Sequence, residues 1–253
     1  MNIEPQNQVN IYGLDNYMKK FINLYQSKNL PNKILLSGQK GNGKCTLAYH
    51  LINYVLSQDE EYKYDINNLS IDKSNKSFKL INNKTSPNFY LIDLVNEKKK
   101  IDITQIRNLI DNLNKSAFNE KPRFVLIDNI DSLSVNSVNS LLKIIEEPND
   151  NINFIFLNHN KKILETLTSR CLKFMINLSN EESINISNQL LNNKVSDLIN
   201  KDLLNYYISP GLIYELFKFG SENDIDLNGK AKGIYFLEIT SDKGEMNKMI
   251  VLQ

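Results

Sequence analysis

Short apolar runs of strand length alternate with helix-like patterns over the first 178 residues of the chain. The runs are almost continuously apolar, which is typical of strands that are covered on both faces. They occupy residues 33–37, 89–94, 123–128, 153–157 and 172–178. Between them, apolar residues recur at helical spacing, most clearly over 47–56, 103–113 and 135–145. Strands and helices in alternation predict an α/β domain with one parallel five-stranded sheet.

The pattern changes twice in the rest of the chain. Residues 179–220 lack strand-like runs and predict several short helices, which we interpret as a second, smaller domain. In residues 221–253, apolar and polar positions alternate around the turn signal SDKG, which predicts a β-hairpin. The sequence therefore predicts three parts, with the first at 1–178. Within that first part, the polar residues 57–88 predict a long loop.

Composition and charge narrow the class of protein. With 253 residues, 41% hydrophobic and 23% charged, the chain is expected to be soluble and globular. Thirty Lys and Arg against 29 Asp and Glu leave a net charge of +1, which argues against independent nucleic-acid binding. Cys45 and Cys171 are too few for a disulfide framework, and they fit a reducing cytoplasm. No segment approaches the roughly 18 apolar residues of a membrane span, and the start does not resemble a signal peptide.

A glycine-rich loop, GQKGNGKCT, follows the first predicted strand. Its spacing matches G-x-x-x-x-G-K-[ST], in which loop amides and a lysine hold phosphate at a helix N-terminus. The hydroxyl position that would bind magnesium carries Cys45, whose sulfur is a poor ligand for this hard cation. Thr46 lies about 100° further around the helix and cannot replace that hydroxyl without a shift. The candidate nucleotide-binding residues of this degenerate loop are Gly38, Gly41, Gly43, Lys44, Cys45 and Thr46.

Two further polar positions end predicted strands. Asp128 ends the strand in FVLIDNIDSL, where P-loop ATPases carry a carboxylate near the metal. Asn158 ends the next strand along the chain. Because ligands bind at the carboxyl ends of the strands in open α/β sheets, we expect both side chains to lie close to the glycine loop.

Three stretches then resemble one known family. NSLLKIIEEP is similar to a family helix, KKILETLTSRC contains its Ser-Arg-Cys signature, and IDITQIRNLIDNL resembles its guide segment. Together, residues 1 to about 220 resemble the delta-prime family of the bacterial DNA polymerase III clamp loader, within the AAA+ group. The resemblance implies a P-loop AAA+ domain at 1–178, a small helical lid domain at 179–220 and a role in DNA replication.

The resemblance also implies roles for individual residues. Arg170 in the Ser-Arg-Cys signature would be an arginine finger, catalytic in trans at the ATP site of a neighbouring subunit. Its guanidinium is then expected to be exposed and unpaired in the isolated chain. Active relatives carry a glutamate where this chain has Asn129, which cannot act as a general base. They also carry a sensor arginine, and the resemblance places Gly211 of this chain at that position. With Cys45, these departures imply a subunit that does not hydrolyse ATP, although Lys44 and the loop amides leave room for weak ATP binding.

Cofactors and partners follow from the same resemblance. Zinc is not expected, because the four cysteines of the family's zinc module are absent between Leu47 and Asp128. The implied partners are the gamma/tau and delta subunits and, indirectly, the sliding clamp and primer–template DNA. The implied location is the cytoplasm, with no membrane partner.

Two other interpretations stay open. The first is an active clamp-loader ATPase, of the gamma type or like a small subunit of replication factor C, against which Cys45 and Asn129 argue. The second is an exported protein, because residues 221–253 separately resemble the C-terminal sorting tail of the type IX secretion route. A truncated or composite chain is the simpler interpretation of that tail. The helical collar domain that usually ends delta-prime subunits does not fit after residue 220.

Overall fold

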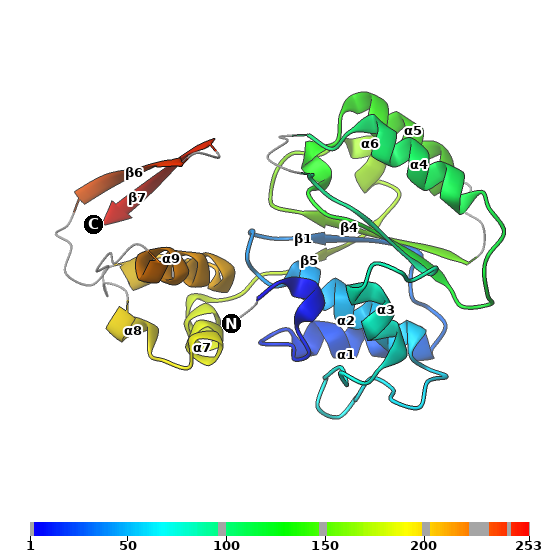
Figure 1. The fold of residues 1–253 in the computed structure, drawn as a ribbon, viewed down its shortest axis with the longest axis horizontal. Coiled ribbons are helices and arrows are strands. Elements are labelled where there is room, and N and C mark those ends of the chain that lie inside the picture. Colours follow the sequence, from blue (N-terminus) through cyan, green and yellow to red (C-terminus); the bar gives the residue numbers. More distant parts are fainter. Residues whose placement is uncertain are drawn as a thin grey trace. The chain divides into compact units, whose positions relative to one another are not determined.

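The computed structural model describes residues 3–95, 100–146, 151–198, 203–222, 233–241 and 244–252. The chain divides into two compact units. The first consists of Met1–Gln39 and Gly43–Asn177, and the second consists of Lys40–Asn42 and Leu178–Gln253. Figure 1 shows the elements of both units.

A parallel five-stranded sheet is the centre of the first unit, in the order β2-β3-β4-β1-β5. Its strands are β1 (Lys33–Ser37), β2 (Phe89–Ile92), β3 (Arg123–Ile127), β4 (Ile152–Asn158) and β5 (Leu172–Met175). The predicted α/β class and parallel sheet are therefore confirmed. The strands predicted at 89–94 and 172–178 end earlier than the apolar runs do, at Ile92 and Met175.

Helices cover both faces of this sheet (Figure 1). One face carries α1 (Asp15–Gln26), α2 (Lys44–Leu56) and α3 (Lys76–Asn82), and the other carries α4 (Ile103–Leu113), α5 (Val135–Glu146) and α6 (Glu165–Thr168). Short 3-10 turns occur at η1 (Pro5–Asn7) and η2 (Ile130–Ser132). The apolar stripes of α4 and α5 face the strands, so Ile106, Leu109, Leu141 and Ile145 are buried in one cluster with Phe154. The inner strands β1, β3 and β4 are buried on both faces, which explains why their sequences are almost continuously apolar.

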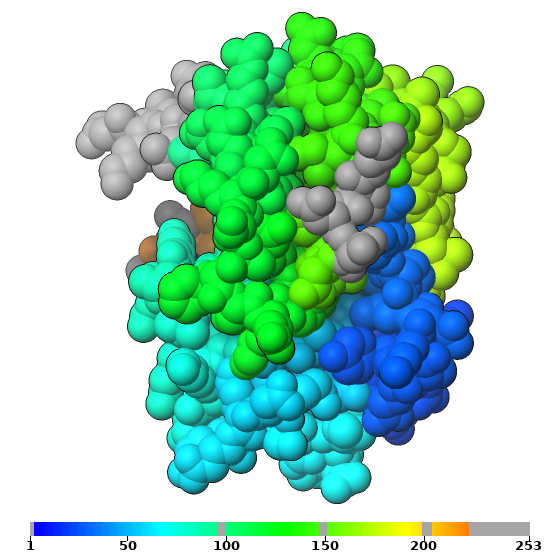
Figure 2. All heavy atoms as spheres, turned by 90° about the vertical axis from the view of Figure 1, so that its right-hand side faces the viewer, coloured from blue at the N-terminus to red at the C-terminus, as the bar shows by residue number. Residues whose placement is uncertain are grey.

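The segment 57–88 is more ordered than its polar composition predicts, because it contains α3. Buried Asn75 starts this helix by accepting a hydrogen bond from the Phe78 amide, and it also accepts one of 2.9 Å from Asn53 of α2. Ser77 donates to the Glu60 carboxylate. The long-loop prediction was therefore wrong over α3, where side-chain hydrogen bonds replace an apolar stripe. The cyan atoms of this segment cover the lower part of the face in Figure 2.

His50 lies on α2 and is completely buried. Its Nδ1 atom lies 2.9 Å from the Tyr64 hydroxyl, and the two rings meet edge to face at a centroid distance of 5.6 Å. Burial lowers the pKa of His50 from 6.5 to about 4, because the charged imidazolium loses its hydration. The folded chain therefore keeps this side chain neutral where the unfolded chain protonates it.

This difference predicts that the free energy of unfolding falls as the pH is lowered from 6.5 to about 4. In that window the unfolded state binds more protons than the folded state, so acid favours unfolding. The expected loss is about 3 kcal/mol, at about 1.4 kcal/mol per pKa unit. Urea unfolding at several pH values should show a shallower pH dependence for His50→Gln than for the natural chain. Equal dependences in the two proteins would contradict the prediction.

The described part of the second unit contains helices and one hairpin. The helices are α7 (Asn180–Leu191), α8 (Val195–Leu198), the 3-10 turn η3 (Leu203–Asn205) and α9 (Pro210–Glu222). Ser179 and Glu182 form a capping box that starts α7, and Val195 and Ile213 are buried together. β6 (Gly233–Ser241) and β7 (Gly244–Leu252) pair antiparallel, which confirms the predicted hairpin. Asp242 and Lys243 of the expected turn lie outside the described residues, and the division into three domains stays a prediction.

Candidate functional site

The glycine loop joins β1 to α2, and two of its glycines are required by geometry. A Cβ atom at Gly38 would collide with the backbone oxygen of Ile176. Gly43 caps the N-terminus of α2 with a φ of 80°, in the left-handed region that favours glycine. The Gly38 amide donates to the Asn158 backbone oxygen at 3.2 Å, so the loop begins against the end of β4.

Lys44 is the first residue of α2 and is 2% exposed. Its Nζ atom donates hydrogen bonds to the backbone oxygens of Gly38 at 2.9 Å and Gln39 at 2.8 Å. Burial lowers the pKa of Lys44 to about 8, against the opposing influence of the Asp128 carboxylate. The ammonium group of the loop is therefore bonded to carbonyls of the loop itself.

Cys45 follows on the first turn of α2 and lies close to Asp128. Desolvation raises the pKa of the thiol well above its usual value, and the Asp128 carboxylate raises it further. The thiol is consequently protonated at neutral pH, and a neutral sulfur group is a weak ligand for magnesium. Thr46 is the next residue and is half-buried.

Asp128 directly follows β3, and its carboxylate contacts His159 and the backbone amide of Asn129. Oδ1 lies 2.9 Å from Nε2 of His159, and it accepts a hydrogen bond of 2.7 Å from the Asn129 amide. Both side chains of the Asp128–His159 pair are largely buried, at 15% and 12% exposed. Sequence reasoning did not identify His159, although its position directly after the polar end of β4 was a usable signal.

The side chains of the other two strand-end residues also form hydrogen bonds within the first unit. Asn129 adopts a left-handed conformation with a φ of 52°, and its Nδ2 atom donates to Asp93 at 2.7 Å. Asn158 donates from Nδ2 to the Lys161 backbone oxygen and accepts from the Lys161 amide. The Asn129 side-chain amide therefore links the loop after β3 to the residue that follows β2, and the Asn158 side-chain amide is used within the loop that follows β4.

The structure thus brings most of the predicted residues to one edge of the sheet. Lys44 and Cys45 follow β1, Asp128 follows β3, and Asn158 ends β4, which lies between those two strands. The expectation that Asp128 and Asn158 lie at the carboxyl ends of their strands agrees with the structure. Arg170 instead contacts Glu146 and Thr166.

Arg170 lies beyond α6 and is exposed, as expected. The expectation that its charge is unpaired was wrong. Its Nη2 atom forms an ion pair of 2.7 Å with Glu146, and its Nη1 atom donates to the Thr166 backbone oxygen at 2.6 Å. Glu146 ends α5, so the pairing depends on the packing of two separate elements and has no sequence signature.

Gly41 and Gly211 meet within the second unit. The Gly211 amide donates to the Gly41 backbone oxygen at 3.0 Å, and a Cβ atom at Gly211 would lie 2.7 Å from Cα of Gly41. The Tyr207 hydroxyl donates to Asn42 at 2.6 Å. Gly211 is therefore in backbone contact with Gly41, and a Cβ atom at this position would be too close to the Gly41 backbone.

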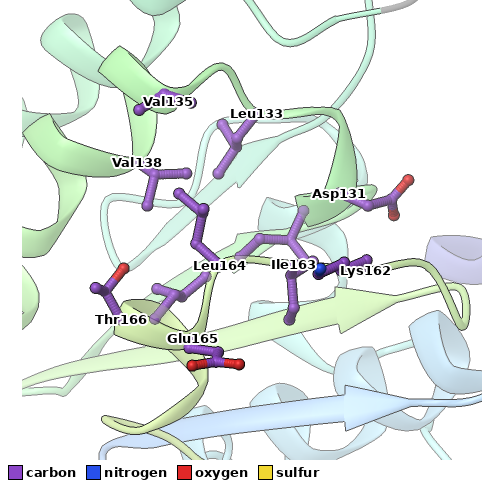
Figure 3. A pocket seen from close by; sticks show the side chains of 11 residues that line it. Asp131, Leu133, Val135, Val138, Lys162, Ile163, Leu164, Glu165 and Thr166 are labelled. Carbon is purple, nitrogen blue, oxygen red and sulfur yellow. The ribbon is translucent and has the colours of Figure 1, made fainter.

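A groove of about 600 Å³ lies elsewhere on the first unit (Figure 3). Residues of η2, α5 and the segment 162–167 line it, and apolar side chains such as Val138 and Leu164 form most of its surface. At its edge, buried Asp131 forms an ion pair of 2.8 Å with Lys161. Among the described residues, no three His, Cys, Asp or Glu side chains are grouped so that they would bind a metal ion. No described helix has the length and apolar character of a membrane span.

Comparisons with known proteins give consistent results. The family model described as "DNA polymerase III, delta subunit" matches residues 13–180. A DNA polymerase III subunit gamma of Buchnera aphidicola subsp. Schizaphis graminum is 30% identical, over 71% of this chain and 47% of the relative. A subunit delta' of Buchnera aphidicola subsp. Baizongia pistaciae is 34% identical, over 56% of this chain and 42% of the relative. This chain spans about half the length of these curated relatives.

Among solved structures, a DNA polymerase III gamma subunit-related protein of Thermotoga maritima is 18% identical with a TM-score of 0.46. The alignment covers 80% of this chain and 59% of that protein.

Proposed function

We propose a function for this chain from one premise, which is that it belongs to the family described as "DNA polymerase III, delta subunit". Its fold is the α/β P-loop fold expected of the AAA+ group, with a parallel five-stranded sheet. The proposed function is that of a delta-prime-like clamp-loader subunit in DNA replication. Such a subunit does not hydrolyse ATP itself and supplies Arg170 to the ATP site of a neighbouring subunit. The relatives named delta' support this proposal.

The observation that carries the inactive-site proposal is the 2.9 Å contact between His159 and Asp128. An active site needs this carboxylate near a magnesium ion, and here it bonds to an imidazole and a backbone amide. Lys44 similarly bonds to carbonyls of its own loop. Magnesium and ATP would compete with these bonds for Asp128 and Lys44, and Cys45 and Asn129 would still supply neither the metal ligand nor the base.

The proposed role of Arg170 rests on its exposure and its chemistry. Its side chain is 36% exposed, on a segment that follows α6 rather than the glycine loop. A guanidinium group binds phosphate oxygens through two parallel N–H groups, a geometry that lysine does not reproduce. Arginines supplied in trans stabilise the charge that develops during phosphoryl transfer.

The proposed partners are the gamma/tau and delta subunits and, through them, the sliding clamp and primer–template DNA. We further propose a cytoplasmic location, no zinc, and at most weak ATP binding without hydrolysis. The near-neutral net charge of +1 agrees with DNA contact made by an assembly rather than by this chain alone.

The purified chain is therefore expected to hydrolyse ATP at the background rate. Competent phosphoryl-transfer enzymes reach about 1–100 s⁻¹, and the site here lacks both the metal hydroxyl and the base. Steady-state phosphate release should be equal for the natural chain and for Lys44→Ala. Turnover near 1 s⁻¹ that is lost in Lys44→Ala would contradict the proposed inactive site.

An active ATPase is the second candidate, because relatives named gamma also match this chain. The same assay distinguishes the two candidates, since an active gamma-type subunit depends on the loop lysine for turnover.

A further inference from the structure

The guanidinium group of Arg170 is held between two separate elements of the first unit. The carboxylate of Glu146, at the end of α5, lies 2.7 Å from Nη2. The backbone oxygen of Thr166, in α6, accepts a hydrogen bond of 2.6 Å from Nη1. α5 and the segment that contains Thr166 also form opposite walls of the groove in Figure 3. Arg170 thus links these two elements at the opposite end of α5 from Val135.

Two contacts through different nitrogen atoms orient a planar group. A guanidinium carries five N–H donors in a fixed plane, so bonds to Nη1 and Nη2 from two directions restrict its rotation. Within the described part of the chain, the contacts of Arg170 with Glu146, Thr166 and Ser169 involve Nη1 and Nη2 and use only part of this donor set. The side chain remains 36% exposed, so a further acceptor is able to approach it from solvent.

The ion pair is poorly suited to a purely stabilising role. Glu146 is 49% exposed, and ion pairs between exposed side chains contribute little to folding stability. The Lys218–Glu222 pair on α9 is an ordinary example, at 3.6 Å and with both side chains more than half exposed. The Arg170–Glu146 pair differs because it is shorter and because a second contact, from the backbone of Thr166, holds the same guanidinium.

We infer that Glu146 is a positioning residue that orients Arg170 toward the terminal phosphate of ATP bound by a neighbouring subunit. This inference rests on the proposed function of Arg170 as an arginine in trans. Glu146 and the Thr166 carbonyl hold part of the guanidinium, and its remaining N–H groups bind the phosphate oxygens. The guanidinium of Arg170 is therefore held in its phosphate-binding orientation before the subunits assemble. No step of the reaction is then needed to align it with the phosphate.

The test uses the full chain in a clamp loader reconstituted with its ATPase subunits. Glu146→Ala is expected to lower kcat for ATP at the completed site by about 10-fold to 100-fold, because misalignment by about 1 Å costs rates of this order. KM for ATP should stay the same, since the nucleotide is held by the other subunit. Glu146→Gln keeps an acceptor oxygen without the charge and should retain an intermediate rate. The matched control Glu222→Ala removes the carboxylate of the ordinary pair and should leave kcat unchanged.

A variant that combines Glu146→Ala with Arg170→Ala distinguishes a positioning role of Glu146 from a merely structural role. If Glu146 acts only through Arg170, adding Glu146→Ala to Arg170→Ala lowers kcat no further. A further loss in the double variant would overturn the inference, as would full activity of Glu146→Ala in a loader that Arg170→Ala inactivates. If Arg170→Ala itself has no effect, the proposed function fails first and the inference fails with it.

Discussion

ATP turnover at the neighbouring site of the assembled clamp loader is expected to fall by a factor on the order of 10³–10⁵ when Arg170 is replaced by alanine. This factor corresponds to roughly 4–7 kcal/mol of transition-state stabilisation. Charge accumulates on the transferred phosphoryl group, and the exposed guanidinium is the group proposed to neutralise it. Single-turnover ATP hydrolysis by the reconstituted complex measures the change at the one affected site.

Two further variants make this result specific. Arg170→Lys keeps the positive charge but loses the planar fork, so it should restore little of the rate. Lys218→Ala removes an exposed cation that is paired on α9, and it should leave turnover unchanged. The thermal unfolding of the isolated Arg170→Ala chain should match that of the natural chain, since the side chain is exposed. Normal DNA-stimulated turnover with Arg170→Ala would show that this arginine has no role in trans.

The second large effect concerns the stability of the fold. Phe156→Ala is expected to reduce the free energy of unfolding by about 3–5 kcal/mol, which is the range for phenylalanine truncations in protein cores. Phe156 is completely buried on β4, where its register partners are Leu35 of β1 and Ile127 of β3. The cavity would open inside the close-packed centre of the sheet, where the neighbouring strands cannot easily collapse around it.

Phe118 provides a matched control for this measurement. It is the same residue type but is 83% exposed, so Phe118→Ala should change stability by no more than about 0.5 kcal/mol. Urea unfolding should show a lower midpoint for Phe156→Ala with an unchanged m-value. Similar losses in the two variants would contradict the burial argument.

Elements that depend on local patterns could be predicted from the residues alone. A strand covered on both faces is apolar at most of its positions, which is why the run at 33–37 coincides with β1. Apolar residues at helical spacing identified α2, α4 and α5, and in α4 and α5 they form the one buried face. The glycine and lysine spacing likewise identified the loop between β1 and α2, because its backbone requirements act within a few residues. The hairpin of β6 and β7 followed from alternation around a short turn.

The contacts between residues far apart in the sequence depend on the tertiary structure and could not be predicted. α3 was missed because it is started by buried Asn75 and a hydrogen bond from Asn53, not by an apolar stripe. Because β3 pairs with β4 in the sheet, His159 after β4 lies in contact with Asp128 after β3. The packing of α5 near α6 paired Arg170 with Glu146. Hydrogen bonds and ion pairs act over about 3 Å, so they depend on which distant segments become neighbours, and periodicity within a segment carries no information about that.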